Sequence, residues 1–113
     1  MKVEQYSFGN IAIDGQTYTS DVIIYPERVD FSWWRKEGHN LQIEDLTGVL
    51  RAEPAVVIIG TGFFGVMKVS KETISHLEAK GILVYVERTG KAVELFNELQ
   101  KNKTVIAALH LTC

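Results

Sequence analysis

Three short apolar runs in the second half of the chain constrain its fold more than any other feature. They are Ala55–Ile59, Ile82–Val86 and Val105–Leu109. All-apolar runs of this length are typical of parallel strands that are covered on both faces. Because a helical segment separates each run from the next, we expect a β-α-β-α-β wrap with right-handed crossovers.

The two segments between these runs carry helix signals. Ser70 is a good N-cap for the first helix, which turns Ile74 and Leu77 inward, and Gly81 is well placed to end it. Thr89 is expected to cap the second helix. The apolar stripe of that helix is Ala92, Leu95, Phe96 and Leu99.

The first third of the chain is predicted to be β-structure. Ile11 and Ile13 lead into Asp14-Gly15, which favours a tight hairpin that returns through Gln16–Tyr18. A third strand is expected at Val22–Tyr25, where Pro26 ends it because proline has no N–H to donate.

Two further elements are predicted before the wrap. Val29–Trp33 alternates apolar with polar residues, as a half-buried fourth strand does, and a short helix is expected between Gln42 and Arg51. We therefore expect one α/β domain over residues 1–113, with β-rich N-terminal hairpins and a wrap in a layered, mixed sheet.

Composition narrows the function classes. The 113 residues include 12 Lys and Arg against 14 Asp and Glu, a formal charge of −2 with no basic stripe, so neither nucleic acid nor an anionic membrane is an expected partner. The N-terminus has no apolar signal region, which predicts a cytoplasmic protein. Cys113 is the single cysteine and cannot form an internal disulfide. No cofactor is indicated.

A glycine-rich turn follows the first run of the wrap. Gly60–Gly65 matches the pattern G-x-G-x-x-G, and Glu87 stands at the end of the next strand, as in dinucleotide-binding folds. The helix cap at Ser70 comes several residues too late for that motif, so glycines that allow a turn and close packing are the favoured interpretation. As a weaker alternative, the N–H groups of Gly60, Thr61 and Gly62 could hold a small anion, a phosphate or a carboxylate.

His110 and Cys113 lie three residues apart near the C-terminal end, so they could ligate a metal or form a Cys/His catalytic pair. A structural zinc site needs four ligands, and only His39 and His76 remain as further imidazoles. We favour a histidine that anchors the end of a strand through hydrogen bonds, with no metal bound.

Phe31, Trp33, Trp34, Arg35 and Lys36 place aromatic residues beside cations, as a base-stacking platform for nucleic acid does, but the net negative charge gives that interpretation no support. In an alternating strand, Trp33 would face the core with Phe31, and Trp34 would cover the opposite side. If Trp34 is exposed, a protein partner is the favoured interpretation, because Trp and Arg are frequent interface anchors.

Four stretches together resemble one protein family. They are Trp34–His39, Val56–Gly62, Ala92–Asn97 and the ending Ala107–Cys113. They are similar to the small domain-of-unknown-function family that includes the adipogenesis-associated domain-containing protein and a mitochondrial complex I assembly factor. The resemblance implies a compact α/β domain and matches the family pattern at Trp34, Arg35, Gly60, Gly62, Asn97, His110 and Cys113, but it implies no reaction.

Two hypotheses for function remain. The first is a non-enzymatic protein-binding or assembly module that presents Trp34, Arg35 and the Gly60 turn; on this hypothesis Trp34→Ala and Arg35→Ala leave the fold intact and abolish binding of a partner. The second is a small-molecule site, with or without catalysis, at Gly60–Gly62, backed by Asn97 or His110. A monomer or weak dimer is expected in either case.

Overall fold

The computed structural model describes residues 1–113 and is built around a five-stranded mixed sheet in the order β5-β4-β10-β7-β9. β10 and β9 both pair in parallel with β7, whereas β4 pairs antiparallel with β10 and β5 antiparallel with β4. The predicted β-α-β-α-β wrap is confirmed. The strand bounds are Val22–Ile24 (β4), Val29–Asp30 (β5), Val56–Gly60 (β7), Leu83–Glu87 (β9) and Val105–Leu109 (β10).

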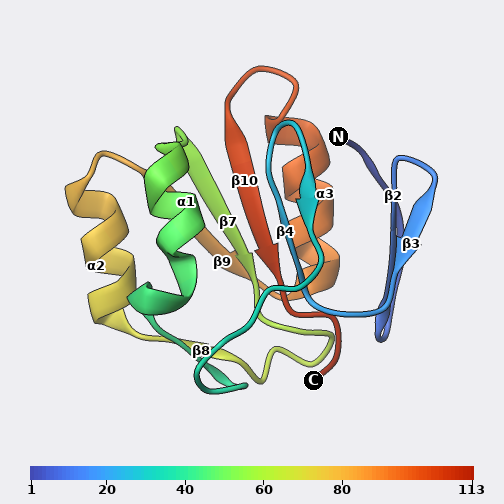
Figure 1. The fold of residues 1–113 in the computed structure, drawn as a ribbon, viewed down its shortest axis with the longest axis horizontal. Coiled ribbons are helices and arrows are strands. Elements are labelled where there is room, and N and C mark those ends of the chain that lie inside the picture. The colour runs from blue at the N-terminus through green and yellow to red at the C-terminus, as the bar shows by residue number, and fades with distance from the viewer.

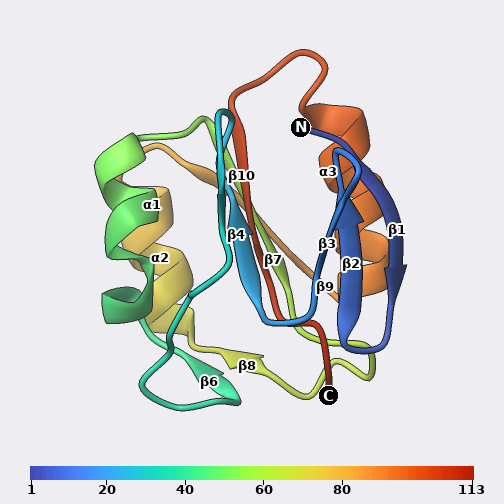
Figure 2. The same ribbon diagram turned by 45° about the vertical axis from the view of Figure 1, so that its right-hand side comes forward.

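Helices cover both faces of this sheet (Figures 1 and 2). One face packs against a 3-10 turn at Ile43–Leu46, α1 (Thr47–Ala52) and α2 (Lys71–Ala79). The other packs against α3 (Thr89–Leu99) and a three-stranded antiparallel sheet of β1 (Val3–Ser7), β2 (Asn10–Ile13) and β3 (Gln16–Tyr18). A short parallel pair, β6 (Asn40–Leu41) and β8 (Lys68–Val69), lies below α1 and α2 in Figure 2. No helix has the length and apolar character that crossing a membrane requires.

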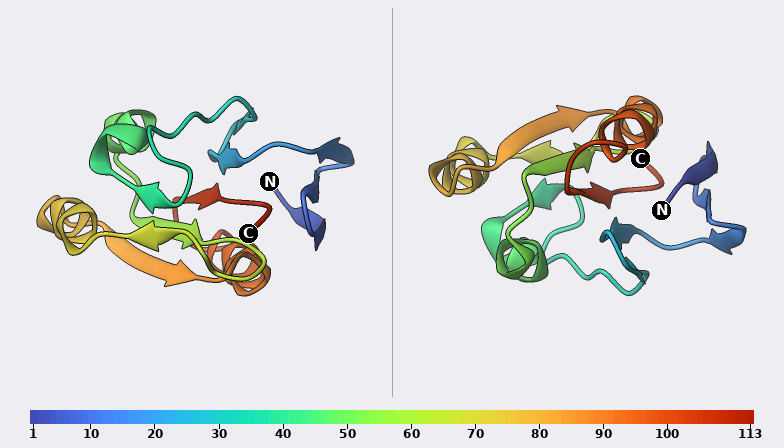
Figure 3. Two further views of the ribbon diagram at one scale, coloured as in Figure 1. Left: turned by 90° about the horizontal axis from the view of Figure 1, so that it is seen from below. Right: turned by 90° about the horizontal axis from the view of Figure 1, so that it is seen from above.

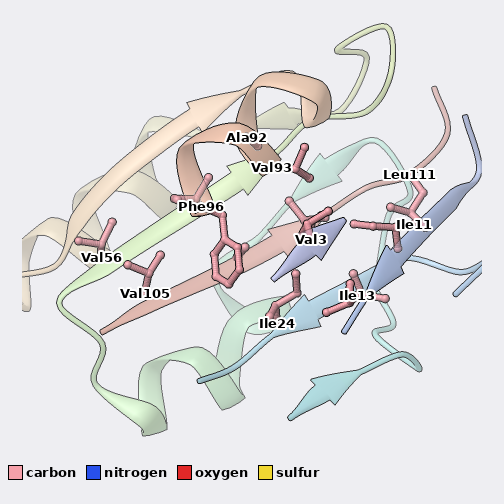
Figure 4. Close-up of a cluster of buried hydrophobic side chains, with 14 residues drawn as sticks. Val3, Ile11, Ile13, Ile24, Val56, Ala92, Val93, Phe96, Val105 and Leu111 are labelled. Carbon is pink, nitrogen blue, oxygen red and sulfur yellow. The ribbon is translucent and has the colours of Figure 1, made fainter. Parts of the chain in front are cut away.

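The central strands divide the apolar core in two because successive side chains point to opposite faces. Val56 and Ile58 of β7 face α3, whereas Val57 and Ile59 face α1 and α2. Figure 4 shows Phe96 of α3 among the buried side chains on the α3 side of the central sheet. Burying an aliphatic or aromatic side chain of this kind contributes about 1.5–3 kcal/mol, so both cores hold the sheet in place.

The predicted hairpin, the predicted short helix and the Ser70 cap are confirmed. Asp14 and Gly15 both have positive φ between β2 and β3, and the Ser70 hydroxyl accepts a hydrogen bond from the N–H of Thr73. β1 was not predicted, because its sequence VEQYS carries a single strongly apolar side chain toward the core.

The predicted strand Val29–Trp33 is wrong beyond Asp30. The Asp30 carboxylate accepts hydrogen bonds from the N–H and the hydroxyl of Ser32, a local turn that competes with strand pairing. Phe31 consequently lies on the surface beside Tyr18 instead of facing the core.

The predicted role of Thr89 as a helix cap is also wrong. Arg88 occupies the N-cap position of α3, and Thr89 is the first helical residue. The buried Thr89 hydroxyl instead donates to the carbonyl of His110, 2.6 Å away, so its side chain joins α3 to the end of β10.

Candidate functional site

Trp34 is the most exposed large hydrophobic residue of the chain, with 75% of its surface open to solvent. It lies in the segment that leads from β5 to β6, where no regular secondary structure constrains the backbone. A solvent-exposed indole does not contribute the free energy that burial would provide, so the exposure of Trp34 is not explained by the stability of the fold.

Side chains on both sides of Trp34 fix this segment to the body of the protein. The indole N–H of Trp33 donates to the carbonyl of Asp45 at 2.9 Å, and the N–H of Lys36 donates to the Asp45 carboxylate at 3.0 Å. Asp45 is buried and also accepts from the N–H of Gln42 at 2.9 Å. Trp34 therefore projects from a backbone that is held before and after it.

Arg35 points inward, in contrast to Trp34. Its guanidinium lies 2.7 Å from the Asp21 carboxylate, donates to the carbonyl of Gly38, and stacks over the Trp33 ring at 4.8 Å from the centroid. Only 7% of the Arg35 side chain is exposed. The prediction that Arg35 is presented to a partner together with Trp34 is therefore wrong, because its guanidinium is buried and paired with Asp21 inside the chain.

Asp21 is the residue on which this cluster converges. Burial raises its pKa, but hydrogen bonds from His110, from the N–H of Leu111 and from Arg35 outweigh burial and lower the pKa to about 2. The carboxylate is thus ionised at neutral pH and joins the start of β4, the segment that carries Trp34 and the end of β10.

His110 completes the cluster, in line with its predicted role as an anchor at the end of a strand. Its Nδ1 lies 2.8 Å from an Asp21 oxygen and 3.1 Å from the Arg35 guanidinium. With a proton on Nδ1 the ring donates to Asp21; without one it accepts from Arg35. Nε2 is buried and has no hydrogen-bond partner in either tautomer.

Strand register explains why these residues meet. β10 and β4 pair antiparallel with Leu109 opposite Val22. This register brings His110, the residue after β10, beside Asp21, the residue before β4. Asp21 was missed in the sequence because that register depends on an antiparallel partner for β10, which the wrap alone does not predict. A carboxylate directly before an apolar strand was the available signal.

The glycine turn is packed by the chain itself. The N–H of Thr61 donates to the carbonyl of Glu87 at 2.9 Å, and the N–H of Gly62 donates to the Thr89 hydroxyl at 2.8 Å. Gly62 has a φ of +111°, and a Cβ there would lie 2.6 Å from the Cys113 carbonyl oxygen. The predicted anion site at Gly60–Gly62 is therefore not supported, because the amides it requires of Thr61 and Gly62 are already used.

Asn97 does not lie with the glycine turn, so the predicted pairing of the two is wrong. Its amide side chain both accepts from the N–H and donates to the carbonyl of Val3, which fixes β1 to α3. Asn97 stands eight residues along α3 from Thr89, which contacts Gly62. At 1.5 Å per residue, this is a separation of about 12 Å along the helix axis.

The predicted Cys/His alternative is not supported either. Cys113 is exposed, and its sulfur makes no hydrogen bond with His110. His39 packs edge-on against the His110 ring, with the centroids 5.6 Å apart. No group of three or more His, Cys, Asp or Glu side chains is arranged to hold a metal.

The hollows of the surface lie elsewhere. Five are present, and none is lined by Asp21, Arg35, His110 or Trp34. A second exposed apolar feature is formed by three phenylalanine rings, with Phe63 5.1 Å from Phe64 and 5.9 Å from Phe8. This cluster was not predicted, because Phe8 comes from the turn between β1 and β2, far along the chain from Phe63 and Phe64.

A family model described as a protein of unknown function, DUF498/DUF598, matches residues 3–110. The chain belongs to this family. The chain also resembles several solved structures. A conserved hypothetical protein of Pyrococcus horikoshii is 30% identical over the whole of both chains, with a TM-score of 0.86.

Two more distant structures share the fold. A Mth938-like domain of Bordetella pertussis is 20% identical with a TM-score of 0.68, over 97% of this chain and 85% of that one. A protein of Bartonella henselae described as an outer membrane protein is 24% identical with a TM-score of 0.82, over 98% and 94% of the two chains. The predicted fold and the predicted membership of a domain-of-unknown-function family are thus confirmed. That this family includes the adipogenesis-associated domain-containing protein and a mitochondrial complex I assembly factor stays a prediction.

Proposed function

We propose that this DUF498/DUF598 chain is a protein-binding module whose contact surface is centred on Trp34. The observation that carries the proposal is the contrast between an indole that is 75% exposed and neighbours on both sides that are fixed by Asp45 and Asp21. Large aromatic side chains dominate the energetics of protein interfaces, and Trp is the most enriched residue among the strongest contacts.

The fixed backbone around Trp34 also favours binding. Ordering a mobile segment on binding costs free energy, and a segment that is already held avoids that cost. The ion pair of Arg35 with Asp21 and the hydrogen bond of Trp33 to Asp45 order the segment before any partner arrives. On this proposal the buried cluster is a positioning device for Trp34 and carries out no reaction.

Affinity capture with matched variants tests the proposal. Wild type, Trp34→Ala and Phe64→Ala are immobilised at equal density and exposed to an extract of the source cells. Phe64 is the control because it is 62% exposed and lies in the separate cluster of three phenylalanines.

We expect wild type and Phe64→Ala to capture the same protein and Trp34→Ala to lose it, with unfolding midpoints in urea that agree for all three. Capture that is equal for wild type and Trp34→Ala would overturn the proposal.

A further inference from the structure

β9 leaves one side of the central sheet open. It is the last strand in the order β5-β4-β10-β7-β9, and Figure 3 shows it at the rim between α2 and α3. Leu83 donates its N–H to the carbonyl of Ala55, and the carbonyl of Glu87 accepts from Thr61. Since strand residues alternate in direction, the N–H and C=O groups of Val84 and Val86 point away from β7 and have no strand to pair with.

Apart from the charged Glu87 at its end, the strand also lacks the features that protect an open edge. Proteins shield edge strands with lysines, prolines, bulges or very short strands. The opposite edge, β5, has only two residues, contains Asp30 and follows Pro26. β9 is five residues long with the sequence LVYVE, and its Leu83 and Val86 side chains are 49% and 38% exposed.

We propose that β9 pairs antiparallel with β9 of a second copy of this chain, about a two-fold axis at Tyr85. In this register Val84 lies opposite Val86 of the second copy, and each pair exchanges two backbone hydrogen bonds. All four outward-facing N–H and C=O pairs of the two strands are then satisfied. The strand is complementary to itself, so the proposed interface is isologous, with the same residues on both copies.

Side chains agree with the same register. The two Tyr85 rings meet across the axis as a close non-hydrogen-bonded pair, and valine lies opposite valine, both favourable cross-strand pairs. Glu87 is the single charged residue of β9 and lies opposite Leu83 of the second copy. The two Glu87 carboxylates are therefore at opposite ends of the interface and do not meet.

The contact is small. Five residues from each copy bury much less than the ~1,600 Å² of a typical stable interface, so the dimer is reversible and its population rises with concentration. This surface is separate from Trp34, and the proposal does not depend on the binding function proposed above.

Sedimentation velocity over a concentration series provides the first test, with wild type, Val86→Lys and the matched control Val66→Lys, since Val66 is 41% exposed and lies outside β9, in the loop between β7 and β8. We expect wild type and Val66→Lys to dimerise alike and Val86→Lys to raise the dissociation constant at least ~10-fold, because a lysine at an open edge opposes strand pairing. A wild type that stays monomeric at every concentration would overturn the proposal, as would an undisturbed Val86→Lys dimer.

Cysteine cross-linking tests the register, in a Cys113→Ser background that removes the single native thiol. Paired Tyr85 Cα atoms lie about 4.5 Å apart in a non-hydrogen-bonded pair, within the reach of a disulfide. Paired Leu83 Cα atoms are offset by four residues, about 13 Å. Tyr85→Cys is expected to give a covalent dimer on mild oxidation and Leu83→Cys is not; equal cross-linking, or none at Tyr85→Cys, would contradict the proposed axis.

Discussion

Single residues within one short segment have opposite roles. Trp34 faces solvent, and Arg35, the next residue, is buried against Asp21. Removing the guanidinium leaves a carboxylate largely buried without its cationic partner, and breaking a buried ion pair in this way typically costs about 3 kcal/mol. We expect Arg35→Ala to lose that much unfolding free energy in urea titration and Trp34→Ala to stay within about 0.5 kcal/mol of wild type. Equal stabilities would show that the cluster does not hold the segment.

Asp21 gives the protein a specific response to acid. Its pKa is lowered from 3.8 to about 2 in the folded state, so the unfolded chain binds its proton first as the pH falls. The stabilisation is present in full above pH 3.8 and is lost as the pH falls toward 2. In urea titrations at a series of pH values, the stability difference between wild type and Asp21→Asn should shrink across this window. A difference that is constant between pH 5 and pH 2 would contradict the role given to the carboxylate.

The sequence supplied part of the site at this scale. Trp34, Arg35 and His110 were all identified, because aromatic, guanidinium and imidazole groups carry recognisable chemistry. Their orientations were not predictable, since they depend on the Asx turn at Asp30 and on an antiparallel register that brings Asp21 from 89 residues away. Long-range pairing of this kind leaves little local signal.

At the scale of elements, the turn after β7 is fixed by the end of the chain. Phe63 donates its N–H to the carbonyl of Thr112, and Val66 donates to the carbonyl of Cys113, so the C-terminal residues run across the turn. The close approach depends on Gly62, where a side chain would collide with the Cys113 backbone. The glycines of the G-x-G-x-x-G pattern therefore serve packing here.

This arrangement predicts a large effect at Gly62 and a small one at Gly90. Gly62→Ala combines a left-handed backbone with a backbone collision and should cost about 3 kcal/mol or more. Gly90 lies in α3 with no atom near a Cβ, so Gly90→Ala should change stability by less than about 1 kcal/mol, in the stabilising direction. Thermal and urea unfolding measure the stabilities of both variants. A Gly62→Ala variant as stable as wild type would show that the C-terminal residues do not depend on close contact with Gly62.

Elements with a strong apolar pattern were predictable, and elements held by a few contacts were not. β7, β9 and β10 were predictable because each of them lies in an apolar run of the sequence. β1, by contrast, is fixed to α3 through Asn97, whose amide bonds the backbone of Val3 on both sides. Hydrophobic periodicity does not predict a strand that is held in place by one polar side chain from another element.

For the whole molecule, the sheet has one shielded edge and one open edge, and its surface has one fixed, exposed indole. On the two proposals made above, Trp34 meets a partner protein and β9 meets a second copy of the chain. The two surfaces are independent, so Trp34→Ala should leave the dimer unchanged and Val86→Lys should leave partner capture unchanged.

Titration calorimetry of the captured partner with wild type and with Trp34→Ala measures how much the exposed indole contributes to binding. Loss of a central Trp contact typically costs about 2 kcal/mol or more, which weakens binding about 30-fold. We expect at least that loss for Trp34→Ala and a change within about twofold for Phe64→Ala. Equal dissociation constants for wild type and Trp34→Ala would contradict the binding role proposed for Trp34.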